Sequence, residues 1–183
     1  DVFATVGVHP DTTESIEPSV AQLVAAAQHP KVLAIGETGL DYYRLKEPLD
    51  WQRERFRRHI RAARESGKPL VVHTRAAASD TLRLLREERA SEAGGVMHCF
   101  TESLEFAQAA LELGFHISFS GIVTFRNAVQ LQAVVPRIPR ERLLIETDTP
   151  LLAPAPKRGQ PNEPANLALV AEALAKIRND TVE

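Results

Sequence analysis

Five ionisable side chains stand where short apolar runs of the sequence end, and four of them, Glu37, His73, His98 and Asp148, could bind divalent metal ions. His9, Glu37, His73, His98 and Asp148 each close a different run. Neutral imidazole nitrogens and carboxylate oxygens suit zinc, manganese or iron(II), and magnesium is tolerated where oxygens dominate. A carboxylate such as Glu37 can bridge two ions. Such a pair clamps the attacking and leaving oxygens of a phosphoryl displacement and acidifies a bound water.

Each of these residues also has a plainer interpretation. A single histidine at a strand end is more often a core or capping residue, Glu37 alone could form a salt bridge, and Asp148 before Thr149-Pro150 could begin a turn. The occurrence of four such residues at the ends of four runs favours a joint functional interpretation. No serine or cysteine nucleophile competes with it, because there is no GxSxG motif and Cys99 lacks a family signature.

The elements that must position these residues are six apolar runs separated by segments with helical periodicity. The runs are rich in β-branched residues and nearly continuous in apolarity, which is typical of parallel strands covered on both faces. They span residues 2–9, 31–37, 69–73, 95–98, 115–121 and 142–148. Helices are predicted near 20–27, over 49–66 up to Gly67, after the possible caps Ser79 and Asp80, over 106–113 before Gly114, over 127–135, and after Pro164.

This alternation of strand and helix predicts right-handed crossovers and a parallel sheet. An open doubly wound sheet is possible, but neither GxGxxG nor GxxxxGK[ST] occurs. A barrel gathers functional residues from the C-terminal ends of several strands, as seen here. We therefore predict an α/β fold of the TIM-barrel (β/α)8 type. Because such barrels have eight strands and about 250 residues, six units in 183 residues predict a partial barrel.

Composition narrows the function classes. The chain has 22 Lys+Arg and 24 Asp+Glu, a net charge of -2, which argues against a broad basic footprint on duplex nucleic acid. One cysteine excludes a disulfide scaffold. Since no run of 18 apolar residues and no signal peptide occur, we expect no membrane span and a cytoplasmic protein. The chain opens at Asp1 rather than at methionine, which fits a fragment of a longer protein.

Seven strings of the sequence resemble the TatD-type metal-dependent deoxyribonucleases. They cover essentially the whole chain in order: GVHP (7–10), GETGLDYY (36–43), VVHTR (71–75), MHCF (97–100), FSGIVTF (119–125), ETDTPLLAP (146–154) and RGQPNEP (158–164). The resemblance implies an amidohydrolase-like (β/α)8 barrel of which this chain carries strands 3 to 8. It also implies hydrolysis of phosphodiesters by a metal-activated water, typically as a 3′-5′ exonuclease on single-stranded DNA.

The resemblance assigns roles to four of the strand-end residues. Glu37 corresponds to the bridging carboxylate, His73 and His98 to ligands of one ion, and Asp148 to a ligand of the other ion and the general base. Two divalent ions (Mg, Mn or Zn) are implied. The family's first strand adds a His-x-His pair that this sequence lacks. We therefore expect one partial domain, 1–183, without the first two βα units and the C-terminal end.

The remaining motif residues are candidates for substrate binding. His9 could donate to a phosphate oxygen, and Arg75 could hold the phosphate or form a salt bridge. Arg158, Asn162 and Glu163 lie in a Pro/Gly-rich loop that could contact phosphate or serve as a structural lid. Tyr42 and Tyr43 could stack on a base or pack their loop. The expected partner is single-stranded DNA or another phosphodiester, with no membrane and no obligate protein partner.

Other interpretations stay open. The six arginines of RERFRRHIRAARE (53–65) suggest nucleic-acid binding, but an outer helix with a solvated face is favoured. A related barrel hydrolase could cleave an amide, lactone or other ester. Such sites often carry a metal-bridging carboxylated lysine at a strand end. That position is occupied by none of Lys31, Lys46, Lys68 and Lys157. A third possibility is a catalytically incomplete fragment or a binding protein.

Overall fold

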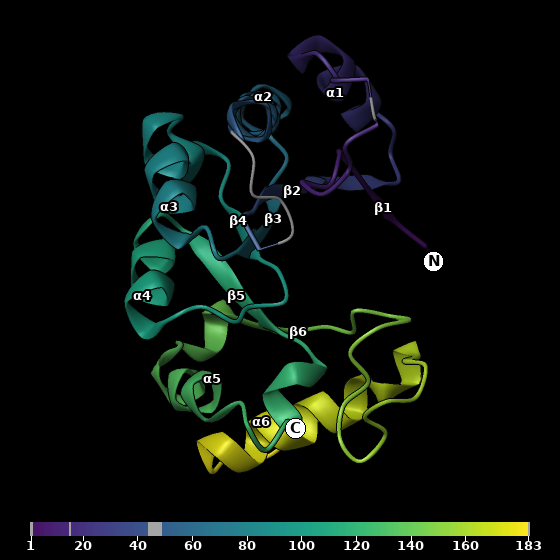
Figure 1. The fold of residues 1–183 in the computed structure, drawn as a ribbon, viewed down its shortest axis with the longest axis vertical. Helices are drawn as coiled ribbons and strands as arrows, with labels where there is room; N and C mark the ends of the chain where they lie inside the picture. Colours follow the sequence, from purple (N-terminus) through teal and green to yellow (C-terminus); the bar gives the residue numbers. More distant parts are fainter. Residues whose placement is uncertain (1, 15, 44–48, 183) are drawn as a thin grey trace. The chain divides into compact units, whose positions relative to one another are not determined.

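Strands and helices alternate along the chain as predicted, in a computed structural model that describes residues 2–14, 16–43 and 49–182 (Figure 1). Lys46, one of the four lysines considered above, lies outside these ranges. The strands are β1 Ala4–Val6, β2 Val32–Asp41, β3 Leu70–Arg75, β4 Gly95–Met97, β5 Phe115–Phe119 and β6 Leu143–Ile145. The α-helices are α1 Val20–Ala27, α2 Asp50–Ser66, α3 Ala78–Glu87, α4 Leu104–Glu112, α5 Val129–Val134 and α6 Leu167–Arg178.

The chain forms two compact units. The first comprises Asp1–His98 with Glu112–Phe115, and the second comprises Cys99–Leu111 with His116–Glu183. The expectation of one partial barrel domain stays a prediction. No helix of the described residues is both long and apolar enough to cross a membrane.

In the first unit, β1 to β4 lie side by side in chain order, and each neighbouring pair is parallel. Helix α2 packs on β2 and against α1 (Figure 1). Its apolar stripe, predicted from Phe56, Ile60 and Ala63, is fully buried. Gly67 ends α2 in the left-handed region with φ 64°, where glycine avoids the clash of a Cβ.

The second unit pairs β5 with β6 in parallel, so that Phe119 lies opposite Ile145. Helix α6 packs on β6 and on the short 3-10 helix η2, Gly121–Thr124, which follows β5. Val170 and Leu174 of α6 supply buried apolar side chains. These contacts hold the loops that follow β5 and β6 on a fixed frame.

Two local predictions need correction. Strand β2 was predicted to end at Glu37, but pairing with β3 continues to Asp41, so Glu37 lies inside the strand. The prediction that Ser79 or Asp80 caps α3 is wrong, because the helix begins at Ala78 and its N-cap is Ala77. The Asp80 carboxylate instead accepts a hydrogen bond from the Tyr42 hydroxyl at 2.7 Å.

Candidate metal centre

Glu37 lies among three imidazoles in the first unit. Its Oε1 atom is 3.4 Å from His9 Nε2 and 3.2 Å from His73 Nδ1. Its Oε2 atom faces a third ring, with His98 Nε2 at 3.8 Å. The two carboxylate oxygens therefore face different imidazoles, as expected for a carboxylate that bridges two metal ions.

Two further carboxylates contact the second nitrogens of the His9 and His73 rings. Asp41, which is only 2% exposed, places Oδ2 3.2 Å from His73 Nε2. Asp11 Oδ1 contacts His9 Nδ1 in the same way. A carboxylate on one ring nitrogen fixes the tautomer and orientation of the imidazole, so the other nitrogen can point at a metal ion. The His9 and His73 rings thus each present one nitrogen toward Glu37 and are held by an aspartate on the other side.

Close approach of β2 to β3 brings His73 to the site. Gly39 lies opposite His73 in the parallel register, and a Cβ at position 39 would stand 1.9 Å from the His73 carbonyl oxygen. Gly39 also has φ 134°, a conformation that L side chains rarely adopt. Only glycine therefore allows this spacing between the strand that carries Glu37 and the strand that carries His73.

Buried polar residues of α2 hold the segment that carries His9. Gln52, Arg55 and His59, spaced i, i+3 and i+7, lie on one helix face and are at most 2% exposed. We call these three residues the inner stripe of α2. A buried helix face is usually apolar. Because these three side chains are polar, their buried donor and acceptor atoms need hydrogen-bond partners.

The inner stripe binds backbone groups of four residues in the loop after β1. His59 Nε2 accepts from the Val8 backbone N–H at 3.0 Å. Arg55 Nη1 donates to the carbonyl oxygens of His9 and Thr12 at 2.9 and 2.8 Å. Gln52 donates to the Pro10 carbonyl and accepts from the Asp41 N–H, both at 2.9 Å. Gln52 therefore ties the His9 loop to the end of β2.

Protonation equilibria in the cluster favour an anionic Glu37. Burial alone would raise the pKa of Glu37, but hydrogen bonds with His73 and His9, and the charge of His98, hold it well below its usual range. Burial opposes protonation of His9, yet hydrogen bonds to Glu37 and Asp11 raise its pKa above the ordinary value. Burial lowers the pKa of His59, in accord with its role as a neutral acceptor.

The donor set of the cluster fits a divalent cation. One ligand atom from each of His9, Glu37 and His73 lies within 4.8 Å of the other two, and all three side chains are partly exposed to solvent. Imidazole nitrogens together with carboxylate oxygen are the donors that zinc and manganese prefer. His9 was predicted to bind substrate, and its position in the structure also makes it a candidate metal ligand.

Asp148 lies in the second unit, three residues beyond β6. Its carbonyl oxygen accepts from the Leu151 N–H at 2.7 Å, which closes the turn containing Pro150. The neighbouring Glu146 accepts from the Cys99 N–H at 2.8 Å and from the Ser118 hydroxyl at 2.6 Å. The role of Asp148 as a metal ligand and general base stays a prediction.

The other predicted substrate residues lie in two different settings. The Asn162 side chain is buried, donates to the Leu151 carbonyl at 2.8 Å and accepts from two N–H groups, so it holds its own loop together. Glu163 is exposed and pairs with Lys157 at 3.3 Å. Arg75 and Arg158 stack on aromatic rings, at 4.0 Å from the Tyr43 centroid and 4.2 Å from the Phe125 centroid.

Sequence reasoning missed Asp11, Asp41 and the inner stripe of α2. Asp41 stands four residues after Glu37 in the GETGLDYY string, and Asp11 stands two residues after His9, so their closeness to candidate ligands was the available signal. The inner stripe had no such signal, because its partners are backbone groups. Arg55 also corrects the expectation that the arginines of α2 form a solvated face, since it is 2% exposed.

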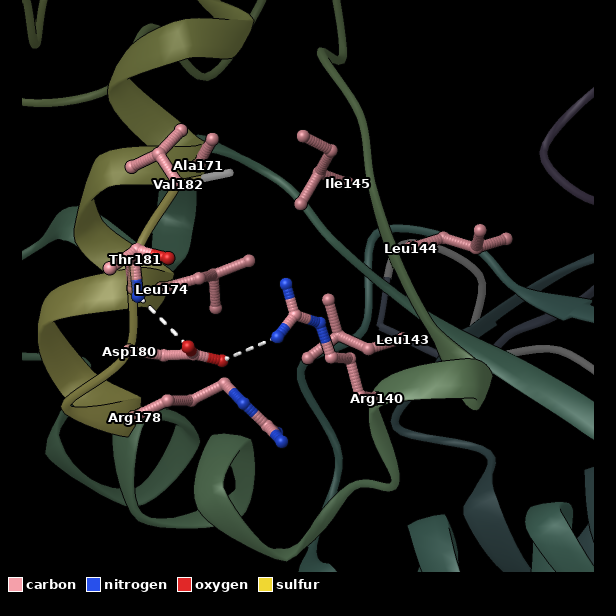
Figure 2. A pocket seen from close by; sticks show the side chains of 11 residues that line it. Arg140, Leu143, Leu144, Ile145, Ala171, Leu174, Arg178, Asp180, Thr181 and Val182 are labelled. Carbon is pink, nitrogen blue, oxygen red and sulfur yellow. Dashed lines mark hydrogen bonds and ion pairs between the residues drawn. The ribbon is translucent and has the colours of Figure 1, made fainter.

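A hollow of about 400 Å³ lies elsewhere in the second unit, between β6 and α6 (Figure 2). Its walls include Leu143, Ile145 and Leu174, and an ion pair of 3.2 Å joins Arg140 to Asp180 at its edge. None of the predicted site residues lines this hollow.

Comparison with known proteins now identifies the family. The model of the family described as TatD related DNase matches residues 1–183. The chain belongs to the TatD family. The resemblance found in the sequence is thereby confirmed.

Individual relatives agree with this assignment. The chain is 50% identical over 183 residues to the uncharacterized metal-dependent hydrolase YcfH of Escherichia coli (strain K12), covering all of this chain and 69% of the relative. It is 38% identical over 182 residues to the 3′-5′ ssDNA/RNA exonuclease TatD of Edwardsiella piscicida, covering 96% of this chain and 70% of the relative.

The fold prediction is confirmed by solved structures of the family. The crystal structure of YJJV, a TatD homologue from Escherichia coli K12, superposes with a TM-score of 0.90 at 29% identity. The match covers 98% of this chain and 70% of that structure. The parallel α/β architecture described above is therefore that of the TatD barrels.

Proposed function

We propose that this chain is a metal-dependent hydrolase that cleaves phosphodiester bonds, most specifically as a 3′-5′ exonuclease on single-stranded DNA. The observation that carries the proposal is Glu37, whose two oxygens face His9 and His73 on one side and His98 on the other. The name of the Edwardsiella piscicida relative, a 3′-5′ ssDNA/RNA exonuclease, supports the substrate class.

In this proposal, Glu37, His73, His98 and Asp148 hold divalent ions, drawn from Mg, Mn or Zn. Such ions would polarise the phosphate and lower the pKa of a water molecule. Glu37 supplies negative charge without first losing a proton, because its low pKa keeps it ionised at neutral pH. Asp41 and Asp11 fix the orientation of the imidazoles. Asp148 is the general base that takes the proton of the attacking water.

Substrate contacts complete the proposal. Arg75 and Arg158 bind phosphate oxygens, and His9 either donates to a phosphate oxygen or serves as an additional ligand. Asn162 and Glu163 shape the loop after β6, with Asn162 acting through the backbone groups that it holds. A barrel commonly places phosphate contacts in the loops at the C-terminal ends of its strands.

The test combines metal content with cleavage. The purified chain, incubated with Mn²⁺, Mg²⁺ or Zn²⁺, is assayed on DNA and RNA oligonucleotides labelled at either end, and on cyclic amides and lactones. We expect shortening of single-stranded DNA from the 3′ end. His73→Ala should lower turnover by more than ~100-fold and reduce the bound metal, and Asp41→Asn should lower turnover by roughly 10- to 100-fold.

The matched control is His29→Ala, which removes an exposed imidazole of the first unit outside the cluster. It should retain wild-type cleavage and metal content. Normal turnover in the His73 variant would contradict the ligand assignment. Cleavage of amides or lactones, with none of oligonucleotides, would instead support the related hydrolase considered above.

A further inference from the structure

Phe125 and Arg158 meet where two loops of the second unit come together. Phe125 follows the 3-10 helix η2 after β5, and Arg158 belongs to the loop after β6. The guanidinium carbon of Arg158 lies 4.2 Å from the centroid of the Phe125 ring. A guanidinium stacked on a ring keeps its in-plane N–H donors available for an anion.

Hydrogen bonds hold this pair on a defined frame. The Thr124 hydroxyl donates to the Gly121 carbonyl at 2.7 Å and accepts from the Ala155 N–H at 2.8 Å, so it joins the two loops. The Gln132 amide donates to the carbonyl oxygens of Val123 and Phe125 at 2.9 and 3.1 Å. The backbone that carries the ring is therefore fixed from two directions.

A hollow of about 430 Å³ opens beside the ring. It combines an aromatic ring, the aliphatic side chains of Ile122 and Leu131, and the exposed amides of Asn127 and Gln130. Small-molecule sites in proteins have volumes of about 300 to 1,000 Å³ and combine apolar walls with a few polar groups. Side-chain amides can hydrogen-bond the edges of nucleobases, since they offer both a donor and an acceptor.

Among the residues that the structure describes, no carboxylate neutralises the charge beside the hollow. Over the ranges that the structure describes, no carboxylate pairs with Arg158, while the adjacent Lys157 is bound to Glu163 at 3.3 Å. Arg126, the residue after Phe125, is exposed and likewise has no carboxylate partner among the described residues. A cation stacked on an aromatic ring, with a second exposed arginine next in the sequence, suits a ligand that carries both a flat base and a phosphate.

We propose that Phe125, Arg158 and this hollow form a nucleobase subsite for single-stranded nucleic acid. One base packs against the Phe125 ring within the hollow, and Arg158 binds a phosphate that flanks this base. The inference rests on the proposed function, because it gives the phosphodiester substrate a place for one base. It predicts that bases contribute to affinity, as stacking on aromatic side chains does in single-strand binding proteins.

Binding without turnover tests the subsite. Fluorescence anisotropy in EDTA measures the affinity for a labelled thymidine decamer and for an abasic decamer with the same backbone. We expect the wild-type chain to prefer the thymidine decamer by roughly tenfold, and Phe125→Leu to abolish this preference. Phe125→Trp should restore it. Leu keeps the apolar bulk of the side chain, so a loss with Leu reports the aromatic ring rather than folding.

Arg158→Ala should weaken binding of both decamers and make the negative slope of log K against log salt shallower by about 0.7, the value for one contact with a single strand. The matched control is Arg61→Ala, which removes an arginine of α2 that is paired with Glu88. It should leave both affinities unchanged.

Equal affinity of the wild-type chain for both decamers, or an unchanged preference in Phe125→Leu, would overturn the subsite. A Phe125→Leu variant that unfolds at lower temperature but keeps the preference would assign the Phe125–Arg158 stack to loop packing alone. Since binding is measured without metal, failure of the chain to cleave DNA would count against the proposed function only.

Discussion

The arginines of α2 are held in a different way from Arg75, at the end of β3, and Arg158, in the loop after β6. All six arginines of α2 lie within 4.0 Å of a carboxylate, as in the pairs Arg57–Glu88, Arg61–Glu88 and Arg64–Glu92. Arg75 and Arg158 instead stack on rings, and neither pairs with a carboxylate of the described residues.

The difference shows how the same side chain serves two purposes. A paired arginine contributes order to a surface but attracts little external anion, because its charge is already compensated. A stacked arginine keeps its donors and its charge for a ligand. The number of arginines in a segment is therefore a poor guide to phosphate binding. An arginine that has no carboxylate partner is the better candidate.

The largest effect is expected at the one α2 arginine that is fully buried. Arg55→Gln removes the donors to the His9 and Thr12 carbonyls and the ion pair with Glu17. We expect the free energy of unfolding to fall by about 3 kcal/mol, because buried groups lose their partners. Urea denaturation measures this value. A change below about 1 kcal/mol would mean that the His9 loop is held without Arg55.

A smaller effect, on binding rather than stability, is expected at Arg75. Arg75→Ala should weaken binding of a single-stranded oligonucleotide about fivefold and make the negative slope of log K against log salt shallower by about 0.7. The melting temperature should stay the same, since the side chain is exposed. Titrations at several salt concentrations check both values. An unchanged salt slope would place Arg75 among the structural arginines.

The smallest effect is expected at Arg61. This residue pairs with Glu88 at 2.8 Å with 43% of its side chain exposed, and Arg57 also binds Glu88. Arg61→Ala should lower the free energy of unfolding by less than about 1 kcal/mol, as is usual for exposed pairs. Its oligonucleotide affinity should equal that of the wild type. A drop in affinity like that of Arg75→Ala would erase the distinction between the two sets.

Much of the fold was predictable from the sequence, because its parallel strands are short apolar runs and its helices have clear stripes. The six runs became the six strands, and Gly67 ends α2 as predicted. The end of β2 was not predictable, since Gly36 and Gly39 resemble loop residues. Their lack of a Cβ instead permits the close approach to β3 that extends the strand.

The candidate ligands were predictable for a similar reason, because Glu37, His73 and His98 stand at or near the ends of runs. The structure adds His9 to this cluster. The residues that hold the ligands were not predictable. Gln52 and Arg55 are polar, and nothing in their own types shows that they face inward and bind backbone groups.

Gln52 limits which substitutions are tolerated where the His9 loop meets the end of β2. Its amide nitrogen donates a hydrogen bond to the loop after β1, and its amide oxygen accepts one from the end of β2, while the side chain is fully buried. An ionised carboxylate at this position could only accept a hydrogen bond, and an ammonium could only donate one. Any redesign of the residues around the site therefore has to keep at position 52 a side chain that both donates and accepts a hydrogen bond.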